Sequence, residues 1–235
     1  MGQNAGMTET APDARWPRVL SLAVHELRTP MTVVAGYIRM LLKERAGPVS
    51  EQQRKLLEEA EKSCTRLSGL VGEMSDLSSL EAGTAPFNRA AVNLHGILEQ
   101  AIAALPELPD REITVELQGE APGNVHADAS RLKAALISLL TALRRELVTS
   151  TRLLVRSRIA ESGGTTSICI AIGDEEQIEQ IAAADPSTLV RFDEWRGGSG
   201  LSLAIARRII GQHGGALLSP PDEGKAGAVV TLPQA

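Results

Sequence analysis

Residues 20–42 read LSLAVHELRTPMTVVAGYIRMLL, and the spacing of their apolar side chains decides the first element of the fold. Apolar residues recur at alternating intervals of four and three, at Leu20, Val24, Leu27, Met31, Val34, Ile38 and Leu41. Such intervals keep side chains on one side of an α-helix and are typical of helices that pack in bundles. We therefore predict one long helix between Pro17 and Gly47.

A second helix is expected after the short turn that contains Gly47 and Pro48. Ser50 precedes Gln53 by three residues, which is the spacing of a capping box at a helix start. The apolar positions that follow form another stripe, at Leu57, Ala60, Cys64, Leu67, Val71, Met74, Leu77 and Leu80. Two long helices joined by a short turn predict an antiparallel hairpin over residues 15–82. Because one hairpin cannot bury all its apolar surface, we expect a homodimer in which two hairpins form a four-helix bundle.

Composition excludes several classes of partner. The 235 residues carry 24 basic and 29 acidic side chains, for a net charge of −5, and show no basic stripe, so we expect no nucleic-acid partner. No window approaches the ~20 apolar residues of a membrane span, and the first residues lack the order of a secretory signal. We expect a cytoplasmic protein without a membrane partner, with residues 1–14 as a disordered tail. Cys64 and Cys169 lack metal-site spacing and are predicted to be reduced core residues.

The chain changes character at residues 83–86, a linker marked by Gly83 and Pro86. Beyond it, strands are expected at 87–92, 113–118, 151–160, 166–172, 215–219 and 227–233, and helices at 94–105, 129–148 and 200–213. Asp128 is the predicted N-cap of the second of these helices. The predicted fold class is α+β: a two-helix hairpin followed, over residues 87–235, by an α/β-sandwich domain with helices on one face of a mixed sheet.

A polar group interrupts the first helix at His25, Glu26, Thr29 and Pro30. Because Val24 belongs to the apolar stripe, His25 lies about 100° around the helix from it and should be accessible. Thr29, four residues on, shares the face of His25, and Pro30 is expected to bend the helix there. An accessible imidazole can act as a nucleophile when a neighbouring carboxylate takes one ring proton. From spacing alone, a surface histidine of no consequence is an equal alternative.

The stretch His25-Glu26-Leu27-Arg28-Thr29-Pro30 resembles the H box of sensor histidine kinases, and the predicted hairpin is similar to their dimerisation and histidine phosphotransfer domain. The likeness continues through the second segment. ADASRLKAALISLLTAL follows the spacing of the N box, FDEW that of the F box, and GGSGLSLAIARRIIGQHGG that of the G2 box. The second segment therefore resembles the ATP-binding catalytic domain of the same family.

The resemblance implies a role for each residue of the opening patch. His25 would be the phosphoacceptor and Glu26 the carboxylate that activates it. Thr29 would hold a water for phosphatase action on a response regulator, while Arg28 and Pro30 would shape the surface that a receiver domain meets. The implied partners are response-regulator receiver domains, an upstream hybrid histidine kinase and a second copy of the chain.

The nucleotide site departs from the family pattern. Ala142 stands where the N box has its metal-binding Asn, and a methyl group cannot coordinate a cation. The Asp position of the G1 box falls on Asp174 only if the alignment is shifted by two residues, and no glycine then stands at the glycine positions that follow. The ATP lid is reduced to a single residue. The remnants Gly198 and Gly200 are better explained as a tight turn before a helix. We expect no tightly bound cofactor, neither ATP nor Mg²⁺, with Mg²⁺ supplied by the receiver partner.

The H box is intact while the nucleotide site departs from the family pattern, and this difference leaves three candidate functions. The first is a phosphotransferase of a phosphorelay, in which His25 exchanges a phosphoryl group with receiver aspartates. This transfer needs only that the donor and the acceptor are positioned in line. The second is an active ATP-dependent sensor histidine kinase with an atypical nucleotide site. The third is a non-catalytic pseudokinase scaffold. The intact H box favours the first.

Overall fold

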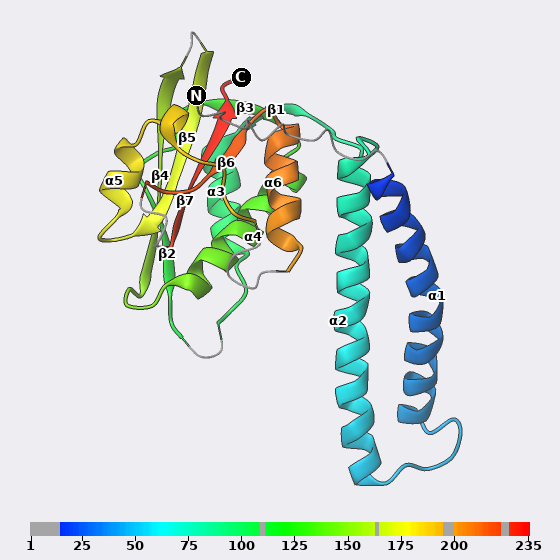
Figure 1. Cartoon of the computed structure of the whole chain (residues 1–235). Coiled ribbons are helices and arrows are strands. Elements are labelled where there is room, and N and C mark those ends of the chain that lie inside the picture. The colour runs from blue at the N-terminus through cyan, green and yellow to red at the C-terminus, as the bar shows by residue number, and fades with distance from the viewer. Residues whose placement is uncertain (1–14, 109–110, 163–164, 195–199, 222–225) are drawn as a thin grey trace, which may run out of the picture. The chain divides into compact units, whose positions relative to one another are not determined.

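The structure is a computed structural model that describes residues 15–108, 111–162, 165–194, 200–221 and 226–235, so the expected tail at 1–14 lies outside the described residues. The chain divides into two compact units, residues 1–85 and 86–235. Each unit has its own architecture (Figure 1). A helical hairpin is followed by an α/β domain with a mixed sheet, which confirms the predicted fold class.

The first unit is a hairpin of two helices, α1 (Trp16–Leu42) and α2 (Glu51–Glu81). α1 carries a proline in its first turn, where a missing N–H removes no helical hydrogen bond. α2 starts at the predicted capping box, which is confirmed. Ser50 Oγ accepts a hydrogen bond from the Gln53 N–H at 3.3 Å, and Gln53 Oε1 accepts one from the Ser50 N–H at 2.8 Å.

The hairpin buries a narrower stripe than predicted. The buried residues are Leu20, Val24, Ala35 and Ile38 on α1, and Val71, Leu77, Ser78 and Leu80 on α2. Leu27 and Val34, which the predicted stripe included, are 44% and 49% exposed. Two helices cover only one narrow strip of each other, so apolar positions beside that strip stay uncovered within one chain.

The second unit contains a five-stranded mixed sheet in the order β2-β4-β5-β7-β6. Its strands are β2 (Thr114–Gln118), β4 (Arg152–Ser162), β5 (Thr165–Asp174), β6 (Ala216–Leu218) and β7 (Gly227–Pro233). β2 and β4 run parallel, and the other neighbours run antiparallel. β1 (Ala90–Asn93) and β3 (Asn124–Ala127) form a separate antiparallel pair. The sequence did not predict β3, because four residues are too few to show a clear alternation.

Helices lie on both faces of the sheet, which corrects the prediction of one covered face. α3 (Leu94–Ala103), α4 (Ala129–Glu146) and α6 (Ser202–Gln212) form a layer on one side (Figure 1). α5 (Ile178–Ala183) packs on the other side and is followed by a 3₁₀ turn, η1 (Pro186–Thr188). Its contacts form a small apolar cluster of Leu154, Ala171, Ile178, Ile181, Leu218 and Val229. A six-residue helix is too short for its period to show in the sequence.

The main core of the second unit lies between the sheet and the layer of α3, α4 and α6. Its fully buried side chains include Leu94, Leu98, Leu132, Leu136, Leu139, Leu140, Leu143, Ile168 and Ile170. This aliphatic packing holds α4, which carries the positions of the predicted N box, against the sheet. None of the described helices combines the length and the apolar character that a bilayer-spanning segment needs.

Candidate functional site

The polar group of α1 lies on the exposed side of the hairpin. The side chains of His25 and Glu26 are 79% and 72% exposed, and Nδ1 of His25 lies 3.5 Å from Oε1 of Glu26. The preceding residue, Val24, is buried, so the turn of the helix carries His25 away from the buried stripe. A carboxylate beside Nδ1 favours the tautomer with its proton on that nitrogen. Nε2 is then left with a free electron pair that faces solvent.

The neighbouring H-box residues share this exposed region. Arg28, Thr29 and Pro30 are all exposed. Pro30 has no N–H to donate to the carbonyl of the preceding turn, yet α1 runs without interruption through it. Thr32 Oγ1 donates a hydrogen bond of 2.8 Å to the Arg28 carbonyl, one turn earlier. The structure thus places His25 and Thr29 on one accessible patch, and the roles implied for them stay predictions.

At the predicted nucleotide positions, the structure has a buried methyl group and a carboxylate that is hydrogen-bonded within its own turn. Ala142 is only 3% exposed on α4 and offers no ligand atom. Asp174 Oδ1 accepts hydrogen bonds from the N–H groups of Glu176 and Gln177 at 3.1 and 3.0 Å, and its Oδ2 accepts one from Gln177 Nε2 at 2.9 Å. Both oxygens of Asp174 therefore shape the turn into α5. Gly200 has a left-handed φ of 62°, as a tight turn requires, and Gly198 lies outside the described residues.

Two glycines that no motif singled out let α5 approach the sheet. Gly173 on β5 and Gly227 on β7 are partners in the strand register. A Cβ atom would lie 2.6 Å from Ile181 Cδ1 if added at Gly173, and 2.8 Å if added at Gly227. Both distances are shorter than real contacts, so a side chain at either position would force the end of the Ile181 side chain to move. The residues lie far apart in sequence, and only the register brings them together.

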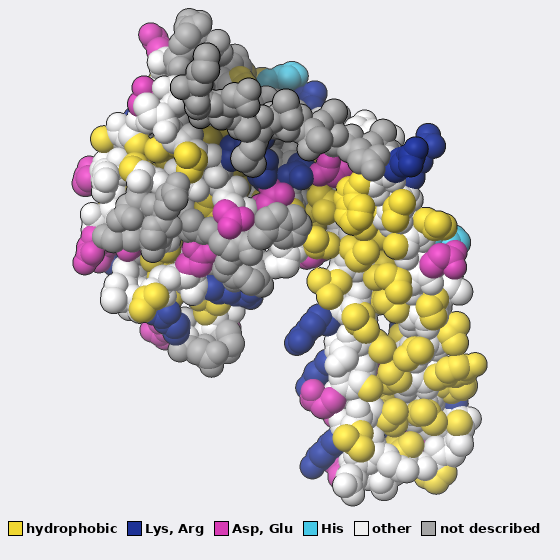
Figure 2. Space-filling model, viewed as in Figure 1, with side chains coloured by type: hydrophobic (Ala, Val, Ile, Leu, Met, Phe, Trp, Pro, Cys, Tyr) yellow, Lys and Arg dark blue, Asp and Glu magenta, His cyan; other side chains and the backbone are white. Residues whose placement is uncertain are grey.

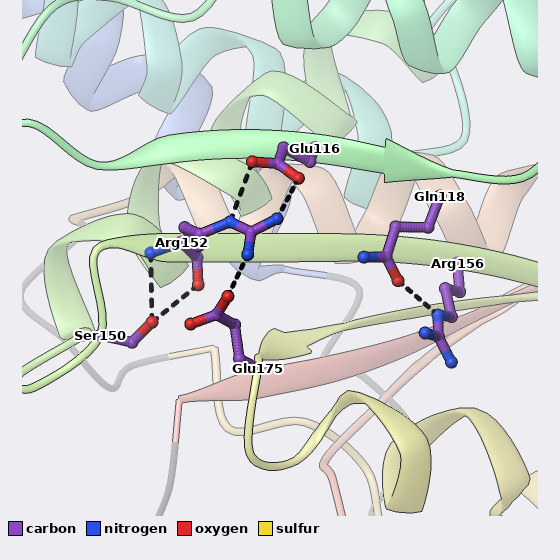
Figure 3. A network of polar contacts seen from close by, with 6 residues as sticks. All are labelled: Glu116, Gln118, Ser150, Arg152, Arg156 and Glu175. Carbon is purple, nitrogen blue, oxygen red and sulfur yellow. Dashed lines mark hydrogen bonds and ion pairs between the residues drawn. The ribbon is translucent and has the colours of Figure 1, made fainter.

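Arg152 on β4 holds the turn that leads into α5 (Figure 3). Its Nε donates to Glu116 Oε1 at 3.0 Å and its Nη2 to Glu116 Oε2 at 2.5 Å, while Nη1 pairs with Glu175. Hydrogen bonding from Arg152 lowers the pKa of Glu116, and the two carboxylates together raise the pKa of Arg152. Glu175 belongs to the acidic run 174–176 that follows β5, and Arg152 offsets part of the charge of that run.

Two further arginines of β4 hold α5 itself. Arg156 Nη1 lies 2.6 Å from Glu179 Oε1. Arg158 Nε donates to the Ala182 carbonyl at 2.6 Å, and its Nη2 donates to the Ala184 carbonyl at 2.7 Å. Alternate residues of a strand point to the same face, so these arginines and Arg152 form a row on the side of the sheet that carries α5. This row fixes the segment that follows β5.

Asp128 is the N-cap of α4, as predicted. Its Oδ1 accepts hydrogen bonds from the N–H groups of Ser130 and Arg131, both at 3.1 Å, and its Oδ2 accepts one from the Asn88 N–H at 2.9 Å. Burial opposes ionisation of this carboxyl, but the hydrogen bonds from Asn88, Ser130 and Arg131 together outweigh burial and lower its pKa to about 2. The start of α4 is therefore built around a charged, fully bonded carboxylate.

His213 ends α6 as its C-cap and joins α6 to the start of α4. Its Nε2 accepts a hydrogen bond of 2.9 Å from the Asp128 N–H, and its Nδ1 lies 2.8 Å from the Ile209 carbonyl. These contacts require the neutral tautomer with the proton on Nδ1. The ring of Phe87 packs edge-on against it, with centroids 5.2 Å apart. Burial lowers the pKa of His213, which suits a structural rather than a catalytic role.

Residues 18–83 match the His Kinase A (phospho-acceptor) domain family, and this range covers the hairpin and includes His25. Nearly the whole chain is also similar to histidine kinases in sequence and in fold. The match to the phospho-acceptor family thus concerns the hairpin, and the likeness in fold extends over most of the chain.

Two relatives illustrate the likeness in sequence. The circadian input-output histidine kinase CikA of Synechococcus elongatus is 30% identical over 217 residues, which cover 87% of this chain and 28% of CikA. The cell-division control histidine kinase PdhS of Brucella ovis is 26% identical over 201 residues, which cover 79% of this chain and 19% of PdhS. The chain thus spans less than a third of either relative.

Two solved structures share the fold. Full-length ShkA, determined in complex with AMPPNP, superposes with a TM-score of 0.64 at 23% identity, over 93% of this chain and 46% of ShkA. The histidine kinase AdeS of Acinetobacter baumannii superposes with a TM-score of 0.52 at 20% identity, over 89% of this chain and 98% of AdeS. At these identities the likeness establishes the fold alone.

Proposed function

We propose that this chain is a histidine phosphotransferase of a phosphorelay. His25 would accept a phosphoryl group from the aspartate of one receiver domain, such as that of an upstream hybrid histidine kinase, and pass it to another. The proposal rests on the contrast between the histidine patch and the nucleotide positions. The His25–Glu26 pair is exposed and oriented, with 3.5 Å between Nδ1 and Oε1. The nucleotide positions offer a buried methyl at Ala142 and a carboxylate at Asp174 whose two oxygens already accept hydrogen bonds from the turn into α5.

The transfer step uses groups that the hairpin presents. Nε2 of His25 attacks phosphorus in line, so an N–P bond forms while the bond from phosphorus to the aspartyl oxygen breaks and the receiver carboxylate leaves. The positive charge that develops on the ring is stabilised by Glu26 beside Nδ1. Mg²⁺ would be supplied by the receiver domain. Thr29, on the same patch, would position a water for hydrolysis of a receiver phosphoaspartate.

A second copy of the chain is the proposed partner of the exposed apolar surface of the hairpin. Exposed large apolar side chains occur on both helices, at Trp16, Val19, Leu22, Leu27, Val33, Val34, Tyr37, Met40, Leu56, Leu67 and Leu70. Figure 2 shows hydrophobic side chains gathered over the hairpin. Monomers rarely expose large contiguous apolar patches, which usually mark interfaces. A four-helix bundle made from two hairpins would bury this surface.

The second candidate is an ATP-dependent kinase with an atypical nucleotide site. The observation that favours it is that CikA and PdhS are both named as histidine kinases. It requires nucleotide binding without the Asn that Ala142 replaces and without the G1 glycines. A non-catalytic scaffold is the third candidate, although it gives no reason for an exposed His25 with a carboxylate at Nδ1.

One labelling experiment separates the three candidates. The full chain is incubated with labelled ATP alone and, separately, with receiver domains that were phosphorylated with labelled acetyl phosphate. His25→Ala tests the site, and His126→Ala is the matched control, because His126 is an exposed histidine in the second unit. We expect label from a receiver in the wild type and in His126→Ala, and none in His25→Ala. Label from ATP alone would refute the relay in favour of the kinase, and label from neither source would leave the scaffold.

A nucleotide titration tests the same conclusion independently. Calorimetry with ATP and Mg²⁺ should show no binding at millimolar nucleotide, because Ala142 offers no metal ligand and both oxygens of Asp174 are engaged in the turn into α5. Binding at micromolar nucleotide would favour the kinase.

A further inference from the structure

A cavity of about 460 Å³ opens on the sheet face that carries α5. Ligand sites commonly have volumes of about 300–1,000 Å³, so the space suits a small molecule. Four strands form its floor, through Arg158 and Ala160 on β4, Ser167 on β5, Thr231 on β7, and Ala216 and Leu218 on β6. Its wall includes Ala183 at the end of α5, then Asp185, Pro186 and Ser187. This face is opposite the layer of α3, α4 and α6, and the cavity contains none of the residues of the predicted nucleotide site (Figure 1).

The cavity exists because short side chains lie opposite one another across neighbouring strands. Ala160 pairs with Ser167, and Ala216 pairs with Thr231. Nearer α5, larger side chains such as Leu154 fill the same face of the sheet. The end of α5 therefore overhangs a hollow rather than a filled surface.

The wall of the cavity presents a fixed positive group. Arg158 Nε and Nη2 donate to the Ala182 and Ala184 carbonyls at 2.6 and 2.7 Å, so the guanidinium is held in place. Its Nη1 has no hydrogen-bond partner among the described residues. A guanidinium with one free edge is suited to a carboxylate.

A negative group lies next to it. Asp185 Oδ1 accepts hydrogen bonds from Ser187 N–H at 2.9 Å and Ser187 Oγ at 2.8 Å, and Oδ2 has no partner in the described part of the chain. The hydrogen bonds from Ser187, together with the charge of Arg158, hold the pKa of Asp185 below its usual value. Glu161, at the end of the cavity on β4, adds a second carboxylate.

The cavity carries charges of both signs, and these charges determine which kind of ligand it can bind. A simple anion would meet Asp185 and Glu161, and a simple cation would meet Arg158. A zwitterion meets an opposite charge at each end. We propose that this cavity binds a free α-amino acid, with its carboxylate at Arg158 Nη1 and its ammonium at Asp185 Oδ2. The small and apolar floor at Ala160, Ala216 and Leu218 then suits a short or aliphatic side chain.

Calorimetric titration of the full chain tests the proposal with alanine, valine and leucine as probes. We expect binding of at least one of them. Two analogues of leucine separate the charges: leucinamide lacks the carboxylate, and 4-methylpentanoate lacks the ammonium. Each should bind at least about tenfold more weakly than leucine, because one charge-assisted contact is lost. Absence of binding for all three amino acids at millimolar concentration would overturn the proposal, as would equal binding of the analogues.

Two variants locate the site. Asp185→Asn removes the charge but keeps the cap of η1, since Asn caps as well as Asp, and it should weaken binding at least about tenfold. Ala216→Leu fills the floor and should abolish binding. Glu179→Gln is the matched control, because Glu179 on α5 pairs with Arg156 of β4 and does not line this cavity. Unchanged melting curves would show that each variant is folded. Unchanged affinity in both site variants would refute the proposed site even if an amino acid binds elsewhere.

Discussion

Replacement of Asp128 by alanine should destabilise the second unit by about 2 kcal/mol. The carboxylate caps α4 through the N–H groups of Ser130 and Arg131, and loss of such a cap costs about 0.5–2 kcal/mol, typically ~1. It also accepts a hydrogen bond from the Asn88 N–H on the segment that enters the unit, and a net hydrogen bond contributes about 1 kcal/mol. The two contributions together give the expected loss.

In a unit of this size, 1 kcal/mol shifts the melting temperature by about 2–4 °C, so Asp128→Ala should lower it by about 4–8 °C. Asp128→Asn is the matched variant, because Asn caps helices as well as Asp and should lose less. The pH dependence follows from the pKa of Asp128, which is lowered from 3.8 to about 2 on folding. Its ionised form therefore stabilises the fold fully above the unfolded pKa, and this contribution is lost as the pH falls from about 4 toward about 2.

Differential scanning calorimetry of the full chain measures these shifts, because it can resolve the transitions of the two units. Hydrogen exchange at the first turn of α4 adds a local measurement and should accelerate in Asp128→Ala. A change below about 0.5 kcal/mol, the usual range for surface substitutions, would refute the argument. An equal loss of stability in Asp128→Ala and Asp128→Asn would show that the charge of Asp128, rather than its capping hydrogen bonds, contributes most of the stabilisation.

Three further predictions test the packing and the interface. Folding lowers the pKa of His213 below its unfolded value of 6.5, so the second unit should lose stability as the pH falls below 6.5. The urea midpoints of unfolding measured above and below that pH should differ less in His213→Gln than in the wild type. Gly215→Ala would place a Cβ 2.1 Å from the Thr231 carbonyl oxygen, so denaturation should show a loss of about 1–3 kcal/mol. Val34→Glu with Tyr37→Glu puts charge on the exposed apolar surface of the hairpin and should give a monomer in light scattering; a persistent dimer would contradict the proposed bundle.

The hairpin and its histidine patch could be read from the sequence because their determinants are local. Helix periodicity places Val24 on the buried stripe and His25 off it within one turn. The caps at Ser50 and Asp128 depend on residues within three positions, so their patterns predict helix starts. By contrast, the stripe on α1 was predicted too wide, because periodicity cannot tell an apolar side chain covered within the chain from one left for a partner, such as Leu27.

The sequence by itself therefore determined the class of fold and the exposed His25–Glu26 pair. Only the tertiary structure decided what became of the segment after β5. Gly173 and Gly227 meet through the strand register, and their lack of side chains leaves room for Ile181 of α5 on the second face of the sheet. That placement joins residues more than fifty positions apart, so no local pattern contains it. Packing and register, which are properties of the folded chain, place Asp174 at the end of β5, where its carboxylate accepts hydrogen bonds from the turn that leads into α5.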